Sequence, residues 1–184
     1  MRVIAGSLKG RRLQAPAWEG LRPTSDKLRE TLFNILAPRI EGTRLLDGYA
    51  GTGALGIEAL SRGAAQVTFV EQDRRAEALI AENLARCGVT NGYAIIRASA
   101  TRALADLQAR ASAFDVILLD PPYDEDAAQV GAVLAQAAGV VTRGGLIVLE
   151  HGRKHPAAAA AGHLARTREV ISGDSVLTFY ACPP

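Results

Sequence analysis

Residues 43–56 read TRLLDGYAGTGALG, a short apolar run that leads into a glycine-rich loop. Arg44 to Asp47 has the length and composition of a buried strand, and Ala54 to Arg62 those of the helix after it. Glycines between a strand and a helix let the backbone approach a ligand closely, and the N-terminus of the helix presents unpaired amide groups. The stretch therefore predicts the first strand–loop–helix unit of an α/β domain, with a ligand at the loop.

Strand-like and helix-like segments alternate from residue 43 to about residue 162. Further strands are expected at residues 66–71, 93–97, 114–119 and 145–150, and further helices at residues 73–86, 101–109 and 127–138. This alternation predicts an α/β fold with a mostly parallel, Rossmann-like sheet and right-handed crossovers. Two last strands, at residues 165–171 and 176–181, should form an antiparallel C-terminal hairpin and bring the sheet to seven strands. The alanine run at residues 157–161 is expected to be helical.

The first 40 residues precede this core. A small β-hairpin is expected from Arg2–Ile4 and Arg11–Gln14, and a helix at residues 25–37 with Thr24 or Ser25 as its N-cap. With 184 residues, the chain is expected to be a single domain, in which residues 1–40 form a basic segment and residues 41–184 the α/β core. No apolar run reaches the ~18–20 residues of a membrane span. The two cysteines lack a CxxC partner, so no zinc site is expected and a cytoplasmic location is predicted.

Charge is distributed unevenly along the chain. Residues 1–39 contain eight Lys and Arg against three Asp and Glu, whereas the rest contains 13 basic and 16 acidic residues. A basic N-terminal stretch on a slightly acidic body suggests an anionic partner, for which phosphate is the natural source of charge. A merely solvated basic terminus is the alternative, and charge alone does not decide between the two.

The glycine loop predicts a nucleotide-like cofactor. Residues 51–56 spell GxGxxG, and Glu71 lies 20 residues after Gly51, as in the dinucleotide-binding fingerprint. Here, however, residues 47–50 intervene between the strand and the first glycine, and Asp47 would repel a pyrophosphate. A carboxylate at the base of the loop suits a ligand with an ammonium and a sulfonium group, which favours S-adenosylmethionine. Glu71 is then placed to accept hydrogen bonds from ribose hydroxyls; the alternative is that the glycines only serve packing.

The strand at residues 114–119 ends in Asp120-Pro121-Pro122-Tyr123. The lone pair of an exocyclic amine on a nucleic-acid base is delocalised into the ring, so the amine is a poor nucleophile. Acceptors such as the Asp120 carboxylate and the Pro121 carbonyl would orient it toward a methyl donor by positioning and electrostatics. Tyr123 would offer an aromatic face to an extruded base. The alternative is a rigid turn without a chemical role.

Four segments together resemble the RsmD-type methyltransferases. They are RVIAGSLKGRRL at 2–13, LRPTSDKLRETLFNIL at 21–36, DGYAGTGALGIEALSRGA at 47–64, and DPPY at 120–123. This family methylates the 2-amino group of one guanine in bacterial 16S ribosomal RNA. The resemblance implies a class I methyltransferase fold, S-adenosylmethionine as cofactor without a metal, and 16S ribosomal RNA as partner, within a small-subunit particle. A monomer is expected.

The resemblance also implies site residues. Cofactor contacts are expected from the glycine loop and the ends of the neighbouring strands, with Thr24 near the methionine end: Asp47, Tyr49, Gly51, Gly53, Glu71, Gln72, Ser99, Ala100 and Thr24. The target amine would be held by Asp120, Pro121, Pro122 and Tyr123. RNA contacts are expected from the basic N-terminal residues Arg2, Lys9, Arg11, Arg12 and Arg22. Ser99-Ala100 departs from the usual pattern, because the acid that often meets the adenine amine is missing there.

Three other functions stay open at this point. Adenine-N6 methylation of RNA or DNA uses the same DPPY chemistry, although the chain has no room for a separate DNA target-recognition domain. A nicotinamide-dependent oxidoreductase would explain GxGxxG but not the longer loop. A non-catalytic RNA-binding module would not require the DPPY motif.

Overall fold

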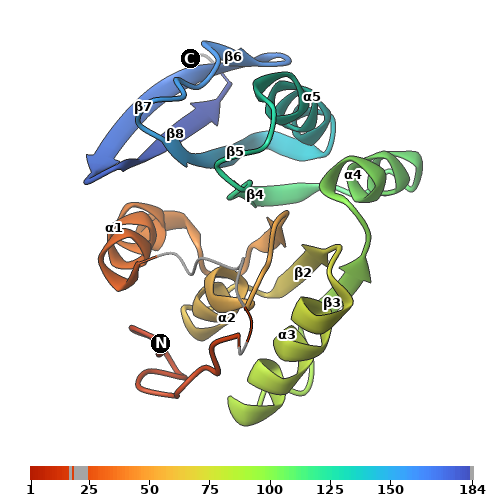
Figure 1. Cartoon of the computed structure of the whole chain (residues 1–184). Helices are drawn as coiled ribbons and strands as arrows, with labels where there is room; N and C mark the ends of the chain where they lie inside the picture. The colour runs from red at the N-terminus through yellow and green to blue at the C-terminus, as the bar shows by residue number, and fades with distance from the viewer. Residues whose placement is uncertain (17, 19–24, 183–184) are drawn as a thin grey trace. The chain divides into compact units, whose positions relative to one another are not determined.

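The computed structural model describes residues 1–16, 18 and 25–182 of the chain (Figure 1). The chain divides into two compact units, Met1–Ala98 and Ser99–Pro184, and each has its own strands and helices. Apart from the helix expected at residues 157–161, the expected helices and strands of the α/β core are present, and the mixed α/β class with an antiparallel C-terminal end is confirmed. The single-domain organisation remains a prediction.

The first unit contains a parallel sheet with helices connecting its strands. Its elements are α1 (Asp26–Leu36), the 3-10 turn η1 (Ala37–Arg39), β1 (Arg44–Asp47), α2 (Ala54–Ser61), β2 (Gln66–Glu71), α3 (Arg74–Arg86) and β3 (Tyr93–Arg97). The strands lie in the order β3-β2-β1, and the register pairs Leu45 with Val67 and Val67 with Tyr93. The carboxyl ends of β1 and β2 therefore lie next to each other, as parallel pairing requires.

Local sequence explains where the helices of this unit begin. Ser25 is the N-cap of α1, where its Oγ accepts a hydrogen bond from Leu28 N at 3.2 Å, and Asp73 caps α3 by accepting from Arg75 N at 2.7 Å. The N-cap of α2 is instead Gly53, in the left-handed region at φ 78°. A glycine therefore marks the point at which the loop turns into α2.

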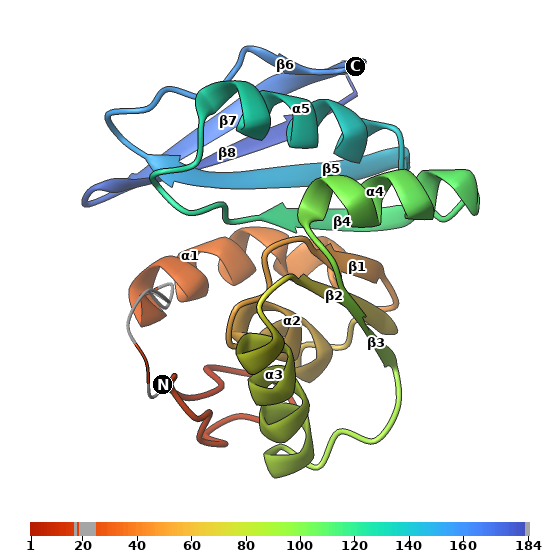
Figure 2. The same cartoon turned by 45° about the vertical axis from the view of Figure 1, so that its right-hand side comes forward.

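The N-terminal segment forms a looser hairpin than expected. Arg2 and Arg12 form an isolated antiparallel bridge, and the backbone amides of Val3 and Gly10 donate to Arg11 O and Val3 O at 2.9 Å. Its side chains Val3 and Leu13 are buried. Figures 1 and 2 show this segment against α2 and α3.

The second unit continues the alternation and then changes direction. Its elements are α4 (Ala100–Ala109), β4 (Phe114–Leu119), α5 (Ala127–Ala138), β5 (Val141–Gly152), β6 (Ala160–Ala161), β7 (Leu164–Ser172) and β8 (Ser175–Ala181). β4 and β5 are parallel, whereas β5–β8, β8–β7 and β7–β6 are antiparallel. The turn between β7 and β8 consists of Gly173 and Asp174, with Gly173 at φ 62°.

Two sequence expectations about this unit were wrong. Residues 157–161 are not helical, because a run of five residues between Pro156 and Gly162 is too short to nucleate a helix, and Ala160–Ala161 pairs with β7 as the extra strand β6. Strand β5 also begins at Val141 rather than residue 145, with an irregularity in its pairing opposite Phe114–Val116. Within the described residues, no helix combines the length and apolar character needed to cross a membrane.

The packing of α2 on β2 leaves no space for a side chain at Gly56. A Cβ there would lie 2.2 Å from Phe69 Cε1 and 2.8 Å from Val67 Cγ1, and both side chains are fully buried. We expect Gly56→Ala to destabilise the fold by about 1–3 kcal/mol through overpacking. The free energy of urea unfolding measures this.

The matched control is Gly131→Ala in α5, where a Cβ would meet nothing within 4 Å. Because alanine has the higher helix propensity, this substitution should stabilise by about 0.4–1 kcal/mol. Equal effects at Gly56 and Gly131 would contradict the packing argument.

Candidate functional site

The glycine loop between β1 and α2 is a tightly hydrogen-bonded turn. Gly51 and Gly53 have φ values of 53° and 78°, and this backbone conformation favours glycine at both positions. Ala50 N donates to Val70 O of β2 at 2.9 Å, and Gly53 N donates to Ala50 O at 2.7 Å. These bonds fix the loop at the carboxyl ends of β1 and β2, where α/β folds bind ligands.

Asp47 shapes this loop from beneath. Its side chain is buried, and Oδ2 accepts a hydrogen bond from Gly56 N in the first turn of α2 at 3.0 Å. The carboxylate therefore contacts the N-terminal end of the helix, where the helix dipole favours negative charge. The Asp47 carboxylate thus lies at the base of the loop and faces the helix.

Glu71, at the end of β2, connects the loop to the segment after its own strand. Oε2 accepts from Gly51 N at 2.9 Å, and Oε1 accepts from Asp73 N at 2.8 Å. Each carboxylate oxygen can accept more than one hydrogen bond, so the pair of oxygens can also meet a vicinal diol such as that of ribose. The structure brings Asp47, Gly51, Gly53 and Glu71 together.

A second feature lies beside Glu71. Asp73 pairs with Arg75 at 2.7 Å, and this side-chain hydrogen bond lowers the pKa of Asp73 to about 2. The Arg75 guanidinium in turn lies over the ring of Trp18, 5.0 Å from its centroid. Trp18 thus packs against a charged pair next to the loop, a contact that the sequence did not predict.

The remaining expected cofactor residues are distributed differently. Tyr49 is half-buried in the loop and Gln72 is exposed after β2. Ser99 and Ala100 belong to the second unit, where Ser99 Oγ caps α4 by accepting from Arg102 N at 3.3 Å. Thr24, like Arg22, lies outside the described residues.

In the second unit, residues 120–122 follow β4 directly, and residues 122–125 form a turn. Glu125 N donates to Pro122 O at 3.0 Å and closes the turn, which uses the carbonyl of Pro122 and not that of Pro121. Pro121 is buried, whereas Asp120 is half-buried. The two prolines restrict φ at positions 121 and 122, which limits the directions that the Pro121 carbonyl can take.

Tyr123 is held by its hydroxyl. The Oη lies 2.6 Å from Ser175 Oγ and donates to Glu150 Oε1 at 3.4 Å, so residues of β8 and β5 hold the tip of the side chain. The residue is nevertheless 37% exposed. A tyrosine held at its hydroxyl and exposed elsewhere can present an aromatic surface to a planar ligand.

The basic N-terminal segment, residues 1–14, is called the basic arm below. Its backbone is bound by buried polar side chains of α2: Glu58 accepts from Ile4 N at 2.7 Å and Ala5 N at 3.0 Å, and Ser61 Oγ accepts from Leu8 N at 2.9 Å. Glu58 is fully buried and also accepts from Arg62 Nε at 2.7 Å. The arm is thus fastened through its backbone, which leaves its charged side chains available.

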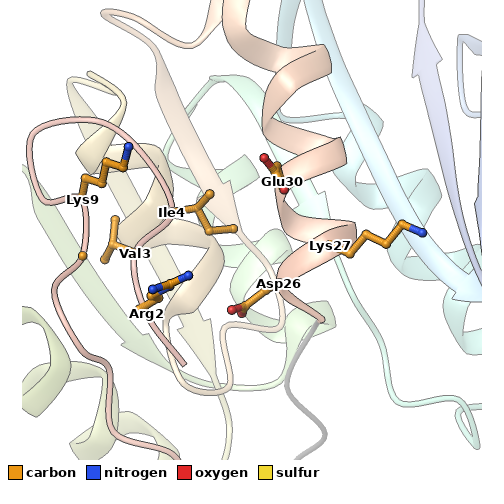
Figure 3. A pocket seen from close by; sticks show the side chains of 8 residues that line it. Arg2, Val3, Ile4, Lys9, Asp26, Lys27 and Glu30 are labelled. Atoms are coloured by element: carbon orange, nitrogen blue, oxygen red, sulfur yellow. The ribbon is translucent and has the colours of Figure 1, made fainter.

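The four described cations of the arm, Arg2, Lys9, Arg11 and Arg12, are all exposed. Arg2 and Lys9 line a cavity of about 330 Å³ between the arm and α1, into which Arg2 and Asp26 extend from opposite sides (Figure 3). The fully buried Arg29 underlies this arrangement, because its Nη2 donates to Arg2 O and, at 3.0 Å, to Asp26 Oδ1. Burial lowers the pKa of Arg29, and Asp26 and Glu58 counter that effect.

Known proteins are similar to this chain over nearly its whole length. The sequence pattern of the family described as "Conserved hypothetical protein 95" matches residues 1–181. The chain is 34% identical over 180 residues to the Escherichia coli protein named ribosomal RNA small subunit methyltransferase D, covering 98% of the chain and 89% of that protein. It is 39% identical to YlbH of Bacillus subtilis, with 98% of each chain covered.

The chain belongs to the RsmD-type methyltransferase family. A solved structure from Escherichia coli, yhhF, superposes with a TM-score of 0.85 at 32% identity, over 98% of this chain and 96% of that one. SMU.776, solved in complex with SAH, has a TM-score of 0.71 at 14% identity, over 83% of this chain and 49% of that one, and shows a shared fold.

Sequence reasoning missed the polar anchors of this RsmD-type protein. Glu58, Ser61 and Asn83 fasten the arm, and Ser175 and Glu150 hold Tyr123. A signal existed for two of them, because Glu58 and Asn83 occupy helix positions whose spacing belongs to the buried face. Among the described residues, no group of His, Cys, Asp and Glu side chains is placed to hold a metal ion.

The attachment of the arm predicts an effect at Glu58. Glu58→Gln would turn an amide NH₂ toward backbone donors, and each lost hydrogen bond to a buried charge is worth about 1.5–3 kcal/mol. We expect the free energy of unfolding to fall by an amount in this range, and amide exchange to accelerate at Ile4 and Ala5.

Glu77→Gln is the control, since Glu77 forms a partly exposed pair with Arg97 at 3.7 Å. Its effect on stability should stay within about 0.5 kcal/mol, and exchange at Ile4 and Ala5 should not change. Unchanged exchange in Glu58→Gln would show that the carboxylate does not fasten the arm.

Proposed function

We propose that this protein transfers a methyl group from S-adenosylmethionine to the exocyclic 2-amino group of a guanine in small-subunit ribosomal RNA. The observation that carries the proposal is the near full-length similarity to ribosomal RNA small subunit methyltransferase D of Escherichia coli, together with the geometry of the glycine loop. When bound, the cofactor supplies an electrophilic methyl group on a sulfonium.

The glycine loop and Glu71 are assigned to the cofactor. Glycine at positions 51 and 53 keeps side chains out of the loop, so a ligand can lie against the backbone. Glu71 Oε1 and Oε2 accept hydrogen bonds from ribose hydroxyls, in addition to those that they accept from Asp73 N and Gly51 N. Asp47 acts by holding the loop against α2 and by adding negative charge that a cationic ligand tolerates better than a pyrophosphate does.

Asp120 and Pro121 are assigned to the target amine. The Asp120 carboxylate and the Pro121 carbonyl each accept a hydrogen bond from the amine, which turns the nitrogen lone pair toward the methyl donor. Positive charge develops on the nitrogen as the nitrogen–methyl bond forms and the sulfur–methyl bond breaks, and the Asp120 carboxylate stabilises that charge until the extra proton is lost to solvent. Tyr123, fixed by Ser175 and Glu150, stacks on the base that has been removed from its RNA context.

The basic arm is assigned to the RNA backbone. Its exposed cations lie on a backbone that is fastened by Glu58 and Ser61, so phosphate contacts would not require the arm to fold first. An assembled small-subunit particle is the proposed form of the substrate. Adenine-N6 methylation is the second candidate, because an acceptor pair of this kind can hold either amine.

Methyl transfer to small-subunit ribosomal RNA tests the proposal. With labelled S-adenosylmethionine, digestion of the RNA to nucleosides should give N2-methylguanosine, whereas N6-methyladenosine would favour the second candidate. Asp120→Ala should lower turnover by about 10²–10³-fold, the usual cost of losing one preorganised polar group, without changing S-adenosylhomocysteine affinity.

Asp124→Ala, which removes an exposed carboxylate in the turn that follows Asp120, is the control and should retain activity. Near wild-type turnover in Asp120→Ala would refute its assignment to the amine. Absence of labelled product from the wild-type protein, on both naked RNA and small-subunit particles, would refute the function itself.

The assignment of the arm predicts a change in salt dependence. Removing two phosphate contacts with Arg11→Gln/Arg12→Gln should weaken RNA binding and reduce the slope of log affinity against log salt by roughly 1.4–1.8. Arg102→Gln/Arg110→Gln is the control, because it removes two exposed cations, one in α4 and one at its C-cap, that lie away from the arm in sequence. Equal slopes for the arm variant and wild type would make the arm an ordinary solvated surface.

A further inference from the structure

Asn83 is a polar residue at a core position. It lies on the face of α3 that also carries Leu79, Ile80 and Leu84, and it is 0% exposed. Burying an amide is unfavourable unless its donors and acceptor are all satisfied, so the bonds that Asn83 makes should explain its presence there.

Those bonds join two distant parts of the first unit. Asn83 Oδ1 accepts from Gln14 N at 2.7 Å, and Nδ2 donates to Gln14 O at 3.2 Å. The same Nδ2 donates to Thr52 O at 2.9 Å. The side chain therefore binds the end of the basic arm in the manner of a neighbouring strand, and it binds the glycine loop with its other hydrogen.

Both ends of this connection bear on the proposed ligands. Thr52 stands between Gly51 and Gly53, the residues assigned to the cofactor. Gln14 lies two residues after Arg12 and directly after Leu13, whose buried side chain anchors this part of the arm. Helix α3 also limits the space at the loop, because a Cβ at Gly53 would lie 3.2 Å from Ile80 Cγ2.

We propose that Asn83 is a positioning residue that couples the arm to the glycine loop, so that RNA on the arm and cofactor in the loop each strengthen the binding of the other. This inference rests on the proposed function. A displacement of the arm moves Gln14, and the short rigid amide of Asn83 transmits that displacement to Thr52. By thermodynamic reciprocity, the factor by which RNA tightens cofactor binding equals the factor by which cofactor tightens RNA binding.

The coupling factor is measured by calorimetry. The dissociation constant of S-adenosylhomocysteine is determined without RNA and with saturating small-subunit ribosomal RNA, and the ratio of the two is the coupling factor. For the wild-type protein we expect a ratio of about 5–150, the usual range for coupled sites. Asn83→Ala should bring the ratio close to 1.

Gln14 provides a matched pair that leaves the core intact. Its side chain is exposed, and only its backbone bonds to Asn83. Gln14→Ala keeps both backbone bonds and should keep the wild-type ratio. Gln14→Pro removes the N–H that donates to Asn83 Oδ1 and should lower the ratio toward 1 even if Asn83→Ala fails to fold.

Ser61→Ala separates coupling from mere loosening of the arm. Ser61 binds Leu8 N but makes no recorded contact with the glycine loop among the described residues, so this variant should bind RNA more weakly and still show the wild-type ratio once RNA is saturating. A ratio near 1 for the wild-type protein, or a wild-type ratio in folded Asn83→Ala or Gln14→Pro, would overturn the inference. If S-adenosylhomocysteine did not bind or no methyl were transferred to RNA, the proposed function would fail instead.

Discussion

The glycine loop depends on two carboxylates from adjacent strands. The carboxylate of Asp47, in β1, accepts a hydrogen bond from Gly56 N, and the carboxylate of Glu71, in β2, accepts one from Gly51 N. Two glycines with positive φ can adopt the required backbone, but in a free chain they would sample many others, and glycine loses more conformational entropy on folding than any other residue. The charged hydrogen bonds at both ends of the loop select one conformation, and the arm, α2 and α3 are arranged around it.

Buried polar groups serve the same purpose at the arm. Residues 1–14 contribute few apolar side chains to the core, and a terminal segment of this kind is ordinarily poorly ordered. Glu58, Ser61 and Asn83 compensate by pairing with backbone groups of the arm, and each is at most 3% exposed, so water competes little for these bonds. Order in the arm is thereby supplied by the helices that flank the glycine loop, so the proposed RNA-binding and cofactor-binding segments are connected within one unit.

The second unit uses a different means of fixing the residues proposed to hold the target amine. Pro121 and Pro122 restrict the backbone after β4, and the hydroxyl of Tyr123 is held by Ser175 of β8 and Glu150 of β5. The antiparallel end of the sheet, added after the parallel strands, therefore has a role beyond closing the fold. It supplies the partners that orient an otherwise exposed aromatic ring.

Local sequence signals were enough to predict most of the helices and strands and the residue types of the loops between them. Hydrophobic periodicity located β1–β4 and α1–α5 closely, and the glycine, Asp-Pro-Pro-Tyr and arm segments identified the family, because these signals are local in the chain. Which polar residues serve as anchors depends on the folded chain, since the pairs Ile4–Glu58, Gln14–Asn83 and Tyr123–Ser175 are separated by 54, 69 and 52 positions. The helix predicted at residues 157–161 was wrong for the same reason. Helix propensity is a local quantity, whereas β6 forms because the edge of β7 is available for pairing.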